Sequence, residues 1–200
     1  YWNACIRKTA HTLAFNIYQL AVNQDVQQKL YEEIAEKAAP AADVVITNEL
    51  LSQLPYLKAF VKETARVMPT ASTILRKLQK DLVVRGYRIP AGYHLMFGHS
   101  VIGQLPQYFE EPQRFMPERW LRDGDDANNH PFAVLPFSFG PRMCLGKRVA
   151  EQEIFLALVR LVQNFKIEYH HEPIGMATRV VNTPDKPLRF KFIDRRSKYP

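Results

Sequence analysis

The sequence predicts an α+β fold that is mostly helical and carries small, segregated β-sheets. Apolar residues recur with helical spacing before residue 69 and after residue 146. Eight of the 14 prolines lie between Pro69 and Pro141, so strands, turns and irregular backbone are expected there. The predicted strands occur in runs and do not alternate with helices, which favours separate small sheets over a parallel sheet.

Three regions have the apolar periodicity of helices. Residues 9–22 place Leu13, Ile17 and Leu20 on one apolar stripe, and Val26, Leu30 and Ile34 continue it at a spacing of four. Residues 55–68 begin with Pro55, which suits a first helical turn, and present to a core Leu57, Phe60, Val61, Thr64 and Val67. Residues 147–164 are apolar over a wide arc, so this helix is expected to be buried on most sides.

Two hairpins and one long loop complete the predicted elements. Residues 82–86 and 87–96 read as one hairpin, and residues 178–183 and 188–193 as a second one. Residues 123–146 show no periodic pattern, and an unstructured loop of this length inside a compact domain is normally functional.

Composition limits the classes of protein that the chain can belong to. Its 200 residues and 23.2 kDa, 46% of them hydrophobic, suffice for one core, and we expect residues 1–200 to be a single, partial domain. Two cysteines are too few for a disulfide-stapled secreted domain, and the longest apolar run is too short to span a membrane. The net charge of +7 is spread along the chain, which argues against a nucleic-acid-binding protein. The first residues fit neither a signal peptide nor a clear transit peptide, so we expect an excerpt of a longer protein.

The long loop ends in the segment Phe137-Ser-Phe-Gly-Pro-Arg-Met-Cys-Leu-Gly146, directly before the helix predicted at 147–164. Several residues of this segment have a physical role if Cys144 binds a haem iron. A thiolate is a strong ligand, and a helix starting beyond Cys144 directs N–H groups and positive dipole toward the sulfur. Gly140 and Gly146 let the backbone turn tightly beside a flat macrocycle. Arg142 suits a haem propionate, and Phe137 can shield the sulfur from water.

The spacing Phe-x-x-Gly-x-Arg-x-Cys-x-Gly resembles the haem-binding signature of the cytochrome P450 family and has a chance probability on the order of 10⁻⁵ in such a chain. The resemblance spans residues 9–193 and implies haem b (iron protoporphyrin IX), with Cys144 as the axial ligand of the iron. Outside this segment, a lone cysteine is more often a buried free thiol. A disulfide between Cys144 and Cys5 is a weaker alternative, because nothing else indicates an oxidising compartment.

Two further segments match the family pattern. The resemblance implies that Glu63 and Arg66, one turn apart on the helix at 55–68, form a buried triad with Arg119 of Phe115-Met-Pro-Glu-Arg-Trp120. It also implies that Arg76 binds the second haem propionate, although a solvated arginine on a strand is nearly as common. The resemblance implies that residues 68–74 pass over the distal face of the haem and help to line the substrate pocket, together with residues 180–186.

The electron donor implied by the resemblance is an adrenodoxin-like [2Fe–2S] ferredoxin. Lys58 and Lys62 lie one turn apart, and Lys147 and Arg148 follow Gly146. Such cations would speed encounter with an acidic donor, although most lysines of this kind are simply solvated. The resemblance to the mitochondrial clan implies a mitochondrial, inner-membrane-associated protein, with the endoplasmic reticulum membrane as the alternative. Peripheral membrane association would come from N-terminal regions that this sequence does not contain.

The sequence departs from the family pattern near its start. The acid and alcohol that normally relay protons during oxygen activation fall on Arg7 and Lys8, which leaves Thr9 one place late. Two permanent cations cannot perform this general-acid task. Either residues 1–8 are foreign sequence, which we favour, or the protein is a relative with weak oxygen activation.

The resemblance implies a haem-dependent monooxygenase that inserts one oxygen atom of O2 into a lipophilic substrate, sterol-like or xenobiotic, with electrons from a ferredoxin. The fragment alone is expected to be inactive. The alternative is a non-catalytic fragment that binds haem through its thiolate or docks a redox partner. The lipophilic substrate rests on analogy with the family and on no pocket visible in the sequence.

Overall fold

The computed structural model describes residues 2–37, 45–121, 130 and 132–195, and for residues 2–6 only the backbone. Its helices are α1 (Trp2–Val22), α2 (Gln24–Lys37), α3 (Asn48–Ser52), α4 (Pro55–Val67), α5 (His99–Ile102) and α6 (Lys147–Asn164). Two 3-10 helices are η1 (Pro117–Trp120) and η2 (Gly140–Arg142). The strands are β1 (Ile74–Lys77), β2 (Leu82–Val84), β3 (Tyr87–Ile89), β4 (His94–Phe97), β5 (Phe165–Glu168), β6 (Met176–Thr178), β7 (Asn182–Pro184) and β8 (Lys191–Asp194).

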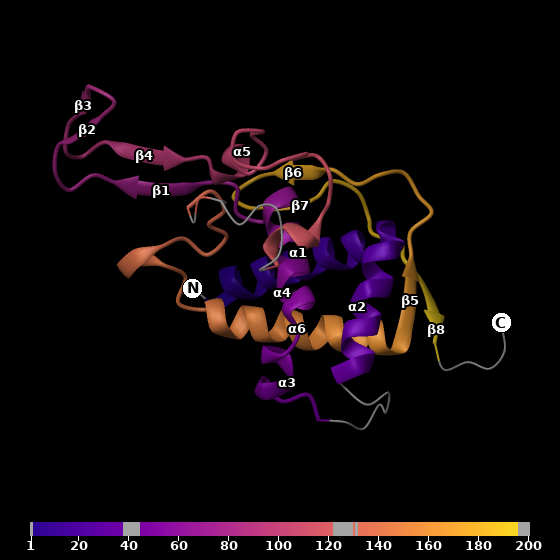
Figure 1. Cartoon of the computed structure of the whole chain (residues 1–200). Coiled ribbons are helices and arrows are strands. Elements are labelled where there is room, and N and C mark those ends of the chain that lie inside the picture. The colour runs from indigo at the N-terminus through magenta and orange to yellow at the C-terminus, as the bar shows by residue number, and fades with distance from the viewer. Residues whose placement is uncertain (1, 38–44, 122–129, 131, 196–200) are drawn as a thin grey trace.

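The strands pair into small antiparallel sheets that lie around the helices (Figure 1). The pairs are β1 with β4, β2 with β3, β5 with β8, and β6 with β7. The predicted α+β class, mostly helical with segregated sheets, is therefore confirmed. No helix within the described residues is both long enough and apolar enough to cross a bilayer.

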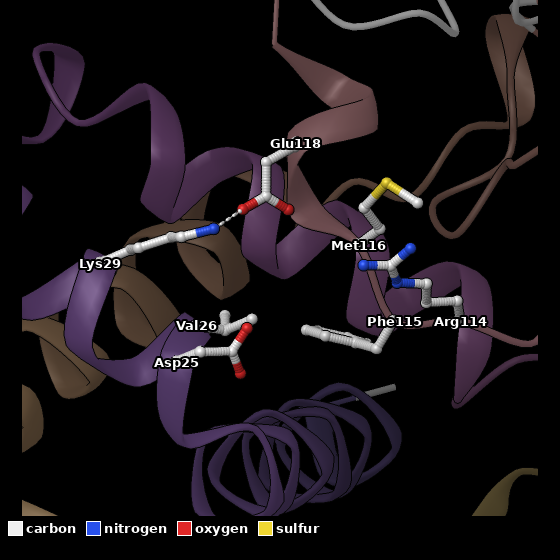
Figure 2. A pocket seen from close by; sticks show the side chains of 7 residues that line it. All are labelled: Asp25, Val26, Lys29, Arg114, Phe115, Met116 and Glu118. Carbon is white, nitrogen blue, oxygen red and sulfur yellow. Dashed lines mark hydrogen bonds and ion pairs between the residues drawn. The ribbon is translucent and has the colours of Figure 1, made fainter.

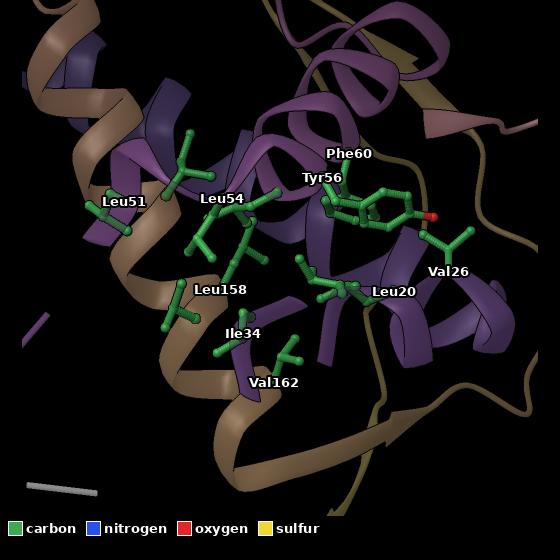
Figure 3. Packing of buried hydrophobic residues seen from close by; sticks show 13 residues of the cluster. Leu20, Val26, Ile34, Leu51, Leu54, Tyr56, Phe60, Leu158 and Val162 are labelled. Carbon is green, nitrogen blue, oxygen red and sulfur yellow. The ribbon is translucent and has the colours of Figure 1, made fainter. Parts of the chain in front are cut away.

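The main core lies where α1, α2, α4 and α6 pack together (Figure 3). The predicted stripe of α2 is confirmed, because Val26, Leu30 and Ile34 are all buried. Leu57 and Phe60 of α4 are fully buried and meet this stripe. Burying one such side chain stabilises the fold by roughly 1.5–3 kcal/mol, so this layer holds the helices that position the loop at Cys144.

Helix α4 begins at Pro55, as predicted, but its N-terminal cap comes from another helix. The Glu33 carboxylate of α2 accepts hydrogen bonds from the backbone N–H of Tyr56 at 2.7 Å and of Leu57 at 3.0 Å. Burial raises the pKa of Glu33, although these N–H groups favour its charged form. Sequence spacing could not show this cap, because it joins residues 23 positions apart.

Helix α6 has the predicted bounds, and no residue from 154 to 164 is exposed, but the expectation that the helix is buried on most sides is wrong for its first turns. Ile154, Leu158, Val159 and Val162 are buried along one stripe, while Val149 is 62% exposed. Helices α1 and α2 and strand β5 cover that stripe. The apolar residues near the start of α6 therefore remain on the surface, beside the loop that carries Cys144.

The strand expected at residues 87–96 is divided in two. Strand β3 pairs with β2 as predicted, but β4 pairs with β1 instead. Pro90 offers no N–H for a ladder, and Gly92 has a φ of 89°, so the chain turns between the two strands.

The predicted C-terminal pairing is also wrong. Strand β6 forms a tight hairpin with β7, with Thr178 opposite Asn182. Strand β8 pairs with β5, which directly follows α6, so that Ile167 lies opposite Phe192. Alternating apolar residues identify strands but carry no information about which strand is the partner.

The fully buried side chain of Gln27 joins strand β5 to the helices. Its amide nitrogen donates to the carbonyl oxygens of Leu20 and Ile167, each at 2.8 Å. Its amide oxygen accepts from the backbone N–H of Ile167 at 2.8 Å. The Gln27 amide therefore makes the hydrogen bonds that a neighbouring strand would make with this edge of β5.

We expect Gln27→Met to lower the free energy of unfolding by about 3 kcal/mol, because three hydrogen bonds are lost and their backbone partners stay buried. Chemical denaturation measures this change. The matched control is Gln28→Met at the neighbouring exposed position, which should change stability by less than about 0.5 kcal/mol. Equal effects of the two substitutions would contradict the role of Gln27.

Candidate functional site

Cys144 lies in a compact turn between η2 and the first turn of α6. Its backbone N–H donates to the Phe137 carbonyl at 2.9 Å, and the Met143 N–H donates to that of Gly140 at 2.9 Å. Gly140 has a φ of 74°, a left-handed conformation that favours glycine. A side chain at Gly146 would meet the Cys144 sulfur, which lies 4.0 Å from the position of a Cβ there. The thiol is free and half-buried.

Exposed apolar side chains lie close to Cys144 along the chain. Leu145 is fully exposed and Phe139 is 65% exposed. Met143 and Val149 are also exposed, as is Phe132, whose ring packs edge-on against Phe139 at 4.8 Å. Contiguous apolar surface of this kind marks a binding site more often than a free surface. The predicted shield, Phe137, is half-buried, and its ring centroid lies 5.9 Å from the Lys147 ammonium.

Arg76 reaches the cysteine loop from strand β1. Its Nη2 donates to Ser138 Oγ at 2.6 Å and lies 3.4 Å from the Arg142 carbonyl oxygen. Its Nη1 donates to the Leu75 carbonyl at 2.8 Å. In Figure 1, η2 and the loop around it lie between the β1–β4 sheet and the start of α6. The structure thus brings Arg76 to Arg142, whose side chain is exposed.

The three residues of the expected triad lie together in the interior. Arg66 holds the Glu63 carboxylate through two hydrogen bonds, Nε to Oε2 at 2.8 Å and Nη2 to Oε1 at 2.7 Å. Arg119 Nε donates to the same carboxylate at 3.1 Å. All three side chains are at most 1% exposed.

Two further donors complete this network. The indole N–H of Trp120 donates to Glu63 at 2.9 Å, as does the backbone N–H of Met116. Arg66 also donates to three carbonyl oxygens of the segment that follows α5, those of Gly103, Pro112 and Arg114. Sequence reasoning missed Trp120, although it directly follows Arg119. Its contact becomes visible only once η1 is known to lie against α4.

The expected docking cations come from α4 and α6. The Lys62 ammonium lies 5.7 Å from the Trp120 ring centroid, and the Lys147 ammonium lies 3.8 Å from Glu151 Oε1. Burial raises the pKa of the Glu151 carboxyl, against the opposing effect of both lysines. Lys62 and Lys147 therefore lie close enough to act on one carboxylate. Lys58 is half-buried and donates to the Ser52 carbonyl at 2.8 Å, whereas Arg148 is exposed.

The first turns of α1 carry the residues that depart from the family pattern. Arg7 and Lys8 are exposed, and Thr9 is half-buried. One turn later, Thr12 donates to the Lys8 carbonyl at 2.8 Å and lies 2.7 Å from the Thr70 hydroxyl. Because the single Thr12 proton is used on Lys8, Thr70 must donate to Thr12. Residues 68–70 are buried against α1 and β7, so only the later part of the predicted 68–74 segment is open.

Two shallow hollows of the described surface lie away from Cys144. One, of about 280 Å³, lies between the start of α2 and the segment before η1 (Figure 2). The Lys29–Glu118 ion pair, at 2.7 Å, crosses it above the Phe115 ring. The other, of about 290 Å³, lies beside β5. The chemistry at Cys144 thus belongs to an open apolar surface and to neither hollow.

Comparison with known proteins identifies the family. The cytochrome P450 family model matches residues 3–192. The chain is 41% identical over 192 residues to the probable cytochrome P450 49a1 of Drosophila melanogaster, an alignment that covers 92% of this chain and 32% of that protein. The chain belongs to the cytochrome P450 family. Its human relatives include the mitochondrial sterol 26-hydroxylase, 35% identical, and the mitochondrial 25-hydroxyvitamin D-1 alpha hydroxylase, 36% identical. These alignments cover 96% of this chain and 37% and 38% of those proteins.

The chain spans about a third of the length of the curated relatives that it matches. Cytochrome P450 proteins bind haem b through a cysteine thiolate. The residues of this chain fit that group: a free thiol lies close along the chain to exposed apolar side chains, as a flat macrocycle requires. The Arg76 guanidinium, bound to neutral oxygens beside Arg142, suits the carboxylates at the edge of the macrocycle.

We expect Glu63→Gln to destabilise the fold by about 3–5 kcal/mol, because it leaves two buried guanidinium groups without their counter-ion. The control is Glu111→Gln, which removes an exposed partner of Arg114 at the same spacing of three residues. That change should cost less than about 1 kcal/mol. Urea denaturation of both variants checks the difference, and similar losses would contradict the buried network.

Proposed function

We propose that the protein containing this chain is a haem-dependent monooxygenase, with Cys144 as the axial ligand of the iron. The observation that carries the proposal is the free thiol of Cys144, whose backbone N–H donates to the Phe137 carbonyl just before α6, together with the exposed apolar side chains of the same segment. The match to the cytochrome P450 family over residues 3–192 supports the same chemistry.

The residues around the thiol would hold the haem in defined ways. Gly140, with its positive φ, and Gly146 would leave room for the macrocycle, and Phe137 would limit water at the sulfur. Arg76 and Arg142 would each bind one propionate. When bound, haem supplies the redox chemistry that cleaves dioxygen. The exposed N–H groups of the first turn of α6 favour negative charge near Cys144 and so support the thiolate.

The proposed reaction is the hydroxylation of the substrate by O2. A substrate C–H bond and the O–O bond break, and one oxygen atom enters the substrate as a hydroxyl group. The other leaves as water with two protons, and a ferredoxin supplies two electrons. The substrate that we propose is lipophilic, since the relatives include a sterol 26-hydroxylase and a 25-hydroxyvitamin D-1 alpha hydroxylase. Residues 71–74 and 180–186 would contribute to its pocket.

Proton delivery is the step in which this chain differs from its family. Arg7 and Lys8 are exposed cations, and they supply neither the carboxyl nor the hydroxyl group that normally relays the protons. Thr9, half-buried one position later, is the alcohol that this chain offers. These cations favour a second candidate function, a haem-thiolate protein with little oxygen activation, if residues 1–8 belong to the natural protein.

We infer that the donor is an acidic [2Fe–2S] ferredoxin and that the protein is mitochondrial. Both human relatives are mitochondrial by name. Lys62 and Lys147 approach the same carboxylate from α4 and α6, which supports one docking surface that also includes Lys58 and Arg148. Association with the inner membrane remains a prediction.

Cys144→Ala should abolish the long-wavelength Soret band that the reduced, haem-loaded protein gives with carbon monoxide. The reason is that this band requires a thiolate on the iron. The control is Cys5→Ala, which removes the second of the two cysteines and should leave the band intact. A band that survives Cys144→Ala, or a wild-type spectrum typical of nitrogen ligation, would overturn the proposed function.

The double substitution Lys58→Glu and Lys62→Glu should slow reduction by an adrenodoxin-like ferredoxin by about tenfold or more at low salt, because it reverses charge on the docking surface. The difference should shrink as ionic strength rises. Stopped-flow reduction measures both effects, with Lys80→Glu, on the turn before β2, as the control. Unchanged kinetics at low salt would reject this docking surface and leave the haem assignment untouched.

A further inference from the structure

Ser138 has an unfavourable backbone conformation inside the cysteine loop. Its φ is 63°, in the left-handed region that residues other than glycine rarely adopt. Arg85 and Glu111 are the other non-glycine residues with positive φ in the described part of the chain. Arg85 lies in the two-residue turn between β2 and β3, where positive φ is the rule. No such hairpin explains Ser138, and strained residues of this kind concentrate at functional sites.

The side chain of Ser138 makes a short contact across the site. Its Oγ accepts a hydrogen bond from Arg76 Nη2 at 2.6 Å, although the two residues are 62 positions apart. The same nitrogen lies 3.4 Å from the Arg142 carbonyl oxygen. The hydroxyl of Ser138 therefore fixes one end of the Arg76 guanidinium against the loop that carries Cys144.

Among the residues that the structure describes, the guanidinium held in this way has no acidic neighbour. Its hydrogen-bond acceptors are two carbonyl oxygens and the Ser138 hydroxyl, all of them neutral. Within the described residues, no carboxylate lies at ion-pair distance from Arg76. A half-buried cation that is positioned by neutral oxygens keeps its charge available for an incoming anion.

We propose that Ser138 is a positioning residue: its hydroxyl, held by the left-handed backbone, orients Arg76 toward a carboxylate of the haem. The inference rests on the proposed function, in which Arg76 binds a propionate. Orienting the guanidinium before the ligand arrives lowers the entropy lost on binding, because Arg76 no longer samples other rotamers. The strained backbone is then the local cost of this orientation.

A purely local explanation makes a different prediction. The Ser138 N–H donates to the Leu135 carbonyl at 3.1 Å, and Gly140 also has positive φ, so the loop itself requires unusual dihedral angles. If only the backbone mattered, glycine at position 138 would serve as well as serine or better. Substitution by glycine therefore separates the two explanations.

The experiment compares Ser138→Gly and Ser138→Ala in the haem-loaded protein, and it measures haem transfer to apomyoglobin and the melting temperature. Both variants should lose haem faster, by about three- to tenfold, because the hydrogen bond to Arg76 is gone. Their stabilities should differ: Ser138→Gly keeps or raises the melting temperature, whereas Ser138→Ala lowers it. In an Arg76→Ala background, Ser138→Gly should add nothing to the rate of haem loss.

The matched control is Arg85→Gly, which relieves a left-handed conformation outside the site and should raise stability without changing haem loss. Haem retention equal to wild type in Ser138→Gly would overturn the positioning role. Additive effects of Ser138→Gly and Arg76→Ala would do the same, because the serine would then act without the arginine. Neither result affects the carbon monoxide spectrum of Cys144, which tests the proposed function separately.

Discussion

The Glu63 carboxylate is buried among five N–H donors from two segments of the chain, and much of the fold depends on their pairing. Arg66 comes from the same helix, whereas Arg119, Trp120 and the Met116 backbone come from the segment at η1. A carboxylate in the interior is tolerated only when it is fully paired, so η1 must lie against α4. Arg66 extends the constraint to three carbonyl oxygens between Gly103 and Arg114. This irregular, proline-containing segment is therefore held by charge-assisted hydrogen bonds in place of secondary structure.

The site at Cys144 depends on two supports that differ in kind. Helix α6 is fixed by its buried stripe against α1 and α2, and the turn before it is closed by the Phe137–Cys144 backbone hydrogen bond. On the other side, Arg76 of β1 reaches the loop through Ser138. The first support is apolar packing of α6, and the second is a polar contact from β1. Cys144 therefore lies between the helical core and the β1–β4 sheet. Cys144 is free and half-buried in this arrangement.

The distribution of charge separates binding from docking. Arg142 belongs to the cysteine loop and Arg76 reaches it from β1; the acceptors of Arg76 among the described residues are all neutral oxygens. Lys62 and Lys147 instead share a surface with Glu151, whose partial burial disfavours its own charge. In the proposed function, the cations of the first surface would bind a small carboxylate ligand, whereas those of the second would bind a protein partner. The net charge of +7 therefore does not show on which surfaces these cations lie.

The sequence alone determined the features that are local along the chain. Ten consecutive residues from Phe137 to Gly146 carry the site pattern, and the apolar spacing of Val26, Leu30 and Ile34 correctly predicted a buried face. The bounds of α6 and the start of α4 at Pro55 were predicted because apolar periodicity and the preference of proline for a first helical turn act within one or two turns. Tertiary structure decided the contacts between distant segments: the pairing of β8 with β5, the cap of α4 by Glu33, and the contact of Ser138 with Arg76. The physical reason is that backbone ladders and buried polar groups select partners by position in space, and the periodicity of a single chain does not encode that position.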